Sequence, residues 1–335
     1  MVKITFKNVG QGDSILIEWN SNNKLKTAIV DCNLYQSANP TLDYIIQQEI
    51  KEIEFIILSH PHTDHFSGFY ELLEYCRNNQ VRINRFLHTS QVTPDFLKSA
   101  TRSLEADEEL FKLFNLLRIM RDNDEIKIYT IDDNPNLIIP LGDTCNMEVL
   151  SPSSTEIDKY IRGVKFPFDE EESTSNPNAN WLSTILKIYN DKACVILTSD
   201  VESTALTRIG KKKSGRVGND KMVMAQIPHH GSKGNLNKPF WQMRRRNEHT
   251  PVVISVGEND FRHPSLEVIV FFDKTTNYEI VSTNLTGALS KESAETRQIS
   301  QILDIVSTNI SAKMCKKRIG DKVFIFNGES CKMVH

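Results

Sequence analysis

A short polar segment, residues 59–68, holds the side chains of this sequence that are most suited to chemistry. It reads Ser-His-Pro-His-Thr-Asp-His-Phe-Ser-Gly, so His60, His62, Asp64 and His65 fall within six residues. The apolar run 55–58 comes directly before it, which predicts a strand whose end presents these side chains from a rigid scaffold. A single histidine is more often structural than a ligand. Four ligand-type residues spaced as H-x-H-x-D-H instead indicate a metal site.

Later apolar runs also end in residues that can bind metal or substrate. Asp200 follows the run 193–198, and a histidine pair follows the run 222–227. We expect one ion to be bound by His60 and His62 and a second by Asp64 and His65, with Asp200 bridging them and His229 or His230 completing the second. Two such ions acidify water and stabilise a developing oxyanion, so the predicted chemistry is hydrolysis.

Three further residues have candidate roles near this site. We expect Asp31, at the end of a strand, to hydrogen-bond the 59–68 segment from a second shell rather than to bind metal. Asp13 is expected to hold the turn 9–14 in shape, and the two glycines of that turn would let it approach the site. His263 either protonates a leaving group or contacts phosphate, or it is a structural histidine at the start of a helix; both readings stay open.

The pattern along the chain predicts two sheets covered by helices. We expect helices near 41–49 and 66–77 and from Pro94 to about 121, and strands at 2–8, 14–19, 27–31, 53–58, 83–88, 126–130, 136–140, 146–150, 182–189, 193–198, 222–227, 252–256 and 322–326. The segment 151–180, rich in Ser, Pro, Asn and acidic residues, is predicted to be a long loop. Residues 1–284 are expected to form a hydrolase domain, and 285–335 a short helix-strand appendage at the C-terminus.

Composition places the chain among ordinary globular proteins, with 39% hydrophobic and 25% charged residues. The N-terminus runs directly into a strand pattern, and no apolar stretch reaches the roughly 18 residues of a membrane span. We therefore expect a cytoplasmic protein that does not bind membranes. The six cysteines are scattered, which argues against a disulfide framework and a thiolate zinc site.

The motifs together resemble the metallo-β-lactamase-fold hydrolases, and among them the C-terminal nuclease-like domain of the ComEC competence protein and its free-standing relatives. The matching stretches lie in order between about residues 10 and 265: Val9-Gly10-Gln11-Gly12-Asp13-Ser14, Ser59-His60-Pro61-His62-Thr63-Asp64-His65, Asn180-x-x-Ser183, Leu197-Thr198-Ser199-Asp200, Pro228-His229-His230-Gly231-Ser232 and Arg262-His263-Pro264. The resemblance implies an α/β fold, an αββα sandwich with a binuclear metal site between its sheets.

Several positions depart from that family pattern. Ser67 and Ser199 stand where glycine is usual, and Cys32-Asn33 follows Asp31 in place of a glycine-containing turn. The superfamily also uses a further histidine before the bridging Asp, and only His88 lies in that interval. Either His88 fills this place or the first ion lacks that ligand, leaving room for Asn180, water or substrate. We favour the second reading, because catalytic sites keep open positions.

The predicted function is a metal-dependent phosphodiesterase, a nuclease that cuts DNA with two Zn or Mn ions and uses Asp64 and His263 as catalytic residues. Of three basic runs, Arg244, Arg245 and Arg246 are the candidates for contact with the DNA backbone. One alternative is a small cyclic-nucleotide phosphodiesterase. Another is a metal-stabilised subunit of a multi-protein defence or DNA-processing complex, which would bind a protein partner through the appendage or the 94–121 helix.

Overall fold

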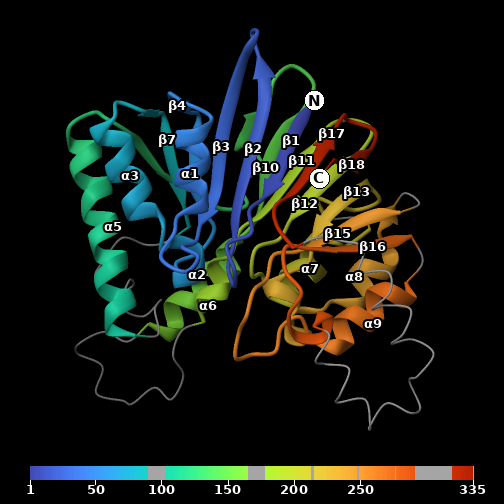
Figure 1. The fold of residues 1–335 in the computed structure, drawn as a ribbon. Coiled ribbons are helices and arrows are strands. Elements are labelled where there is room, and N and C mark those ends of the chain that lie inside the picture. The colour runs from blue at the N-terminus through green and yellow to red at the C-terminus, as the bar shows by residue number, and fades with distance from the viewer. Residues whose placement is uncertain are drawn as a thin grey trace.

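Two β-sheets face each other at the centre of the molecule, and helices lie against their outer faces (Figure 1). The structure is a computed structural model, which describes residues 1–89, 103–164, 178–212, 215–246, 249–275, 277–290 and 319–334. The predicted α/β sandwich is therefore confirmed.

The first sheet has the strand order β18-β17-β1-β2-β3-β5-β7-β8. Its strands are β1 Val2–Phe6, β2 Ser14–Ser21, β3 Lys24–Cys32, β5 Phe55–Leu58, β7 Arg85–His88, β8 Lys127–Thr130, β17 Lys322–Phe326 and β18 Cys331–Met333. The pairs from β18 to β3 are antiparallel, and those from β3 to β8 are parallel. The short strands β4 Glu52–Ile53 and β6 Arg82–Ile83 pair separately.

The second sheet has the order β16-β15-β13-β12-β11-β10-β9, with β14 also paired to β13. Its strands are β9 Ile138–Pro140, β10 Asn146–Ser151, β11 Ile185–Tyr189, β12 Cys194–Leu197, β13 Lys221–Gln226, β14 Arg245–Arg246, β15 Thr250–Ile254 and β16 Tyr278–Ser282. The strands from β12 to β16 run parallel. The parallel strands of each sheet therefore bring their carboxyl ends to a common edge.

The helices lie in two groups, one outside each sheet (Figure 1). The α-helices are α1 Pro40–Gln47, α2 Thr63–Phe66, α3 Phe69–Asn78, α5 Leu104–Asp122, α6 Ser154–Gly163, α7 Ser203–Ile209, α8 Lys238–Met243 and α9 Leu266–Lys274. The short 3-10 helices are η1 Ala179–Leu182, η2 His229–Gly231, η3 Lys233–Asn235 and η4 Gly287–Leu289. None of the helices in the described ranges is long and apolar enough to cross a membrane.

Alternation along the strands divides the core into three apolar layers. On β5, Phe55 and Ile57 face the other sheet, whereas Ile56 and Leu58 pack against the helix side. The central layer contains side chains of both sheets, and the outer layers join one sheet to α3 and α5 and the other to α7, α8 and α9. Because side chains alternate faces with a period of two, each central strand contributes to two layers and is held from both sides.

Parts of the predicted element pattern need correction. The segment 151–180 is not a continuous loop, because α6 begins there with a capping box between Ser153 and Glu156. The helix predicted from Pro94 is described only as α5, which begins after Ser103, and residues 90–102 lie outside the described ranges. The helix pattern at 299–306 also lies outside them.

The C-terminal segment contributes directly to the first sheet. β17 pairs with β1 over its whole length, with Val2 opposite Phe326 and Phe6 opposite Lys322. Figure 1 shows β17 lying beside β1 near the N-terminus. The domain division after residue 284 stays a prediction, but these strands of the predicted appendage are an edge of the sandwich.

Candidate metal centre

The segment after β5 places its ligand-type side chains on a tight turn and the one-turn helix α2. His62 precedes α2 with extended backbone, and its N–H donates to the His60 carbonyl at 3.1 Å. Asp64 and His65 lie inside α2. The turn and the helix therefore bring side chains from neighbouring positions to one side.

The glycine turn 9–14 packs directly against the backbone of the ligand segment at Asp64. Gly12 has a φ of 136°, and a Cβ added there would lie 2.3 Å from the Asp64 carbonyl oxygen. The N–H of Asp13 donates to that same carbonyl at 3.0 Å. The close approach predicted for this turn is thus present, and it requires a residue without a side chain.

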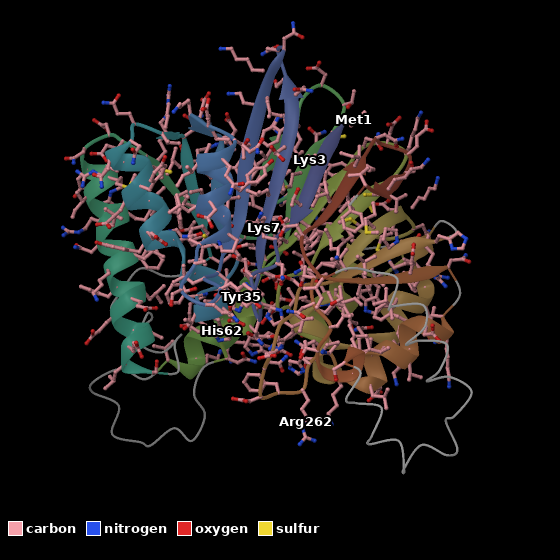
Figure 2. The ribbon with its side chains drawn as sticks, viewed as in Figure 1. Met1, Lys3, Lys7, Tyr35, His62 and Arg262 are labelled. Atoms are coloured by element: carbon pink, nitrogen blue, oxygen red, sulfur yellow. The ribbon has the colours of Figure 1, made fainter. Side chains whose placement is uncertain are left out.

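Residues from both halves of the chain converge above the carboxyl ends of β5, β12 and β13. The ligand-type side chains form three groups, and within each group the potential ligand atoms lie within 4.8 Å of one another. The groups are His60, His62 and Asp200; Asp64, His65 and His230; and Asp13, His65 and Asp200. Most of these side chains are buried, and Asp64 is 34% exposed. Figure 2 shows His62 at this end of the molecule.

Two histidines of the second group present bare nitrogens to the same carboxylate. His65 Nδ1 lies 2.7 Å from Asp31 Oδ2, and His230 Nδ1 lies 2.7 Å from the Ser255 carbonyl oxygen. Both partners can only accept, so each Nδ1 carries the proton and each Nε2 has a free lone pair. Both Nε2 atoms lie 3.6 Å from Asp200 Oδ1. His230 Nε2 also lies 3.3 Å from Asp64 Oδ2.

A pair of serines orients the first group. Ser59 Oγ donates to Asp31 Oδ2 at 2.7 Å and accepts from Ser199 Oγ at 2.7 Å. Since its proton is used, Ser59 can only accept from His60 Nδ1, which lies 3.1 Å away. His60 Nε2 is then bare, 2.9 Å from His62 Nδ1 and 3.9 Å from Asp200 Oδ2.

His229 faces Oδ2 of Asp200, whereas His65 and His230 face Oδ1 of the same carboxylate. Asn235 Nδ2 donates to the Val201 carbonyl at 3.0 Å, which turns Asn235 Oδ1 toward His229 Nδ1 at 3.0 Å. His229 Nδ1 therefore carries a proton, and its Nε2 lies 3.5 Å from Asp200 Oδ2. Asp200 thus has histidine nitrogens on both oxygens, with His230 on one side and His229 on the other.

These residues fit a site for divalent cations. His65 Nε2, His230 Nε2 and Asp200 Oδ1 are buried and have no hydrogen-bond partner among the described residues. Lone pairs that face a carboxylate in a buried site need a cation between them. Imidazole and carboxylate ligands of this kind suit several divalent metals.

Without metal, protons take that place and shift the ionisation of the cluster. Burial works against a charged His230, but Asp200, Asp64 and Asp13 outweigh it and raise the pKa of His230 to about 9. Burial also works against an ionised Asp200, but His229, His230 and His65 hold its pKa well below the ordinary value. Burial lowers the pKa of His60 well below its ordinary value, and His65 and His62 act in the same direction.

Of the two residues considered for the remaining position of the first ion, Asn180 lies at the site. Its Nδ2 is 3.4 Å from His229 Nδ1, and its buried Oδ1 has no hydrogen-bond partner in the described part of the chain. The ring of His88 packs instead against Phe86 and Phe114. Within the described residues, His88 is not one of the converging ligand-type side chains.

His263 lies beside the cluster. Its ring is edge-on to that of His229, with centroids 5.7 Å apart, and its buried Nδ1 has no hydrogen-bond partner within the described ranges. Burial lowers the pKa of His263 to about 4, and His229 and His230 act in the same direction. At neutral pH His263 is therefore an uncharged imidazole, which suits contact with phosphate better than delivery of a proton.

The structure contradicts the predicted role of Arg244. Its side chain is buried, and its guanidinium donates to the carbonyls of Gly210, Gly218 and Phe240. Arg246 donates to the Arg244 carbonyl at 3.0 Å and lies over the Tyr278 ring. Helix α8 returns the chain to the beginning of β13, where Lys221 lies opposite Arg245, whereas the histidine pair follows the end of β13. The arginine run is thus at the far end of that strand.

Several residues that position the ligands were not predicted. Ser59, Ser199, Asn235 and the Ser255 carbonyl orient three histidines, and Gln226 Oε1 accepts from the N–H groups of both Thr198 and Ser199. Ser199, which stands where the family pattern has glycine, has a φ of 46°, and its hydroxyl donates to Ser59 Oγ. Serine after a strand is too common in loops to have indicated this role.

Comparison with known families supports the fold. Residues 8–117 match the family model described as the metallo-beta-lactamase superfamily. A search of curated proteins finds no match to this sequence.

Solved structures with this architecture are similar over most of the chain at low sequence identity. The metallo-beta-lactamase fold protein YhfI from Bacillus subtilis is 10% identical with a TM-score of 0.45, and the alignment covers 84% of this chain and 96% of that one. Tm1679, a metal-dependent hydrolase of the beta-lactamase superfamily, is 12% identical with a TM-score of 0.45 over the same shares. Zn-bound PqqB from Methylobacterium extorquens is 10% identical with a TM-score of 0.44, covering 85% and 99%. The layered architecture and the family match over residues 8–117 show that this chain has the metallo-β-lactamase fold.

Proposed function

We propose that this protein is a metal-dependent phosphodiesterase, and specifically a nuclease that acts on DNA. The observation that carries the hydrolase part is the convergence of the bare Nε2 atoms of His65 and His230 on Asp200 Oδ1. His60, His62 and Asp200 would hold one divalent ion, and Asp64, His65, His230 and Asp200 the other. When bound, such ions acidify water and neutralise the charge that develops on an attacked phosphate.

The residues around the ligands keep them in the protonation state that this chemistry needs. Asp31 and the Ser255 carbonyl hold the Nδ1 protons of His65 and His230, and Ser59 accepts from His60. Each ring therefore already points its Nε2 toward the place of the cations, with no conformational change needed. Such outer contacts orient ligands and raise their basicity.

His263 is proposed to bind the substrate. As a neutral imidazole next to His229, it can donate a ring N–H to a phosphate oxygen or to the oxygen of the leaving group. A His263→Ala variant should therefore retain its metal and lose most of its activity. Full activity in this variant would contradict a role in substrate binding and would favour a purely structural role for His263.

The choice of DNA rests on the ordered motifs that resemble the ComEC nuclease-like domain, including Arg262-His263-Pro264, and this relationship remains a proposal. The run at 244–246 no longer supports it, because Arg244 is buried. Positive charge beside the site comes instead from Arg262, whose side chain extends into solvent at the end of the molecule where His62 lies (Figure 2).

The test is cleavage of linear duplex, single-stranded and circular DNA in the presence of Mn, Zn, Mg or a chelator. Asp64→Ala and His62→Ala should abolish cutting, whereas Asp43→Ala, on the exposed side of α1, should not change it. Metal content of each protein is measured in parallel. Bound metal without cutting of any DNA would overturn the nuclease proposal, and cyclic nucleotides would be the next substrates to assay.

A further inference from the structure

An aromatic side chain is displayed beside the metal centre on a firmly held loop. Phe261 lies between β15 and α9 and is 65% exposed. Single exposed apolar residues are common on protein surfaces, so exposure alone says little. The way in which this residue is held, and what it contacts, distinguishes it.

Hydrogen bonds and close packing fix the loop around Phe261. Asn259 donates to the carbonyls of Gly257 and His263, at 2.8 and 3.0 Å, and accepts from the His263 N–H at 2.9 Å. A Cβ added to Gly257 would lie 2.3 Å from the carbonyl carbon of Gly10, so the loop rests directly on the glycine turn below the site. Phe261 is therefore presented by a backbone that is already ordered.

The ring of Phe261 continues a series of rings that starts at the metal centre. His229 Nε2 lies 3.5 Å from Asp200, and the rings of His229 and His263 are 5.7 Å apart. Phe261 then stacks on His263 with centroids 5.7 Å apart and planes inclined by only 21°. With one face on His263 and most of the side chain exposed, the ring offers a second face to a planar group.

We infer that Phe261 stacks on a base of single-stranded DNA, next to the phosphodiester that the metal centre cleaves, and that Arg262 contacts the following phosphate. This inference rests on the proposed nuclease function and names its substrate as unpaired DNA. In a duplex the base faces are already covered by neighbouring bases. Stacking on an aromatic side chain therefore selects single strands and frayed ends, with little preference for base identity.

The experiment compares Phe261→Ala, Phe261→Trp and wild type on two oligomers of equal length, one of thymidine nucleotides and one of abasic nucleotides. Alanine should lower kcat/KM on the thymidine oligomer by about tenfold, in line with the loss of one base–aromatic stack. It should change the rate on the abasic oligomer by less than about twofold. Tryptophan, which also stacks, should retain wild-type rates on both.

Matched variants separate stacking from general damage. Phe111→Ala removes a phenylalanine that is 56% exposed on α5 and should leave both rates unchanged. Arg262→Ala should weaken the binding of both oligomers equally. It should also lower the slope of log affinity against log salt concentration by about one. Equal losses on the two oligomers in Phe261→Ala, or none on either, would overturn the inference.

A binding measurement keeps this inference separate from the proposed function. Chelated wild-type protein should quench the fluorescence of a single-stranded oligonucleotide that contains 2-aminopurine, and Phe261→Ala should not. If the wild type quenches the fluorescence but cleaves DNA with none of the metals, the nuclease proposal is wrong and the stacking site is supported. If the wild type cleaves DNA but does not quench the fluorescence, the stacking inference is wrong and the nuclease proposal is supported.

Discussion

Asp31 Oδ2 lies 2.7 Å from His65 Nδ1, and this contact decides which nitrogen of His65 faces Asp200. The backbone of Asp31 is in the left-handed region, with φ of 59°, so its carboxylate reaches the segment after β5 from the end of β3. The same carboxylate accepts from both the N–H and the hydroxyl of Ser59. One side chain therefore orients ligands of both groups.

Asp31→Asn should weaken metal binding by about 10- to 100-fold, because the amide is a poorer acceptor for His65 and disturbs Ser59. Asparagine tolerates a positive φ, so the backbone should be retained. Competition with a fluorescent chelator measures the change, and Asp43→Asn is the control. Unchanged affinity in Asp31→Asn would show that His65 does not depend on this contact.

Gly12→Ala should damage the site through the backbone. The added Cβ would meet the Asp64 carbonyl at 2.3 Å and require a φ of 136° that alanine disfavours. We expect lower thermal stability and weaker metal binding, measured by calorimetry and chelator competition. Gly234→Ala is the matched control, since its nearest neighbour is the Ser232 hydroxyl at 3.7 Å. Equal behaviour of the two variants would contradict the close approach of the turn.

Arg244→Ala should destabilise the protein without changing its affinity for DNA. Loss of the guanidinium leaves carbonyls of Gly210, Gly218 and Phe240 buried and without this donor, which should lower the free energy of unfolding by about 2–3 kcal/mol. Urea denaturation measures this, and the exposed Arg118→Ala should change it by less than about 0.5 kcal/mol. Weaker DNA binding by fully folded Arg244→Ala would restore the role that burial excludes.

Bound metal should remove the pH dependence that His230 gives to the stability above pH 6.5. In chelated protein the pKa of His230 is raised from 6.5 to about 9, so the folded chain holds a proton that the unfolded chain releases within this range. Its contribution is complete below pH 6.5 and is lost as the pH rises to about 9, with a slope of up to about 1.4 kcal/mol per pH unit.

The measurement is the difference in unfolding free energy between wild type and His230→Gln at several pH values. With chelator this difference should shrink as pH rises from 6.5 to 9. With saturating metal it should stay about constant over this range, because metal replaces the proton on Nε2 of the folded chain and the unfolded chain has already released its own. A difference that is independent of pH in chelator would contradict the raised pKa.

The sequence by itself determined the chemistry of the centre. Metal ligands must be histidines and carboxylates, and these were concentrated in residues 60–65 and at the ends of apolar runs, where strands deliver side chains to loops. The same local patterns determined most strands and α1. The capping box at Ser153 and Glu156 was also present in the sequence and would have located α6.

Only the tertiary structure decided how those residues are used. Ser59 and Ser199 are 140 positions apart, and no local pattern indicates that their hydroxyls meet. Arg244 has the composition of a surface contact, but the return of the chain along α8 buries it at the far end of β13. Likewise β17 reaches β1 from the other end of the chain. Periodicity and spacing report on neighbours along the chain, whereas burial and hydrogen-bond partners depend on which distant segments the fold brings together.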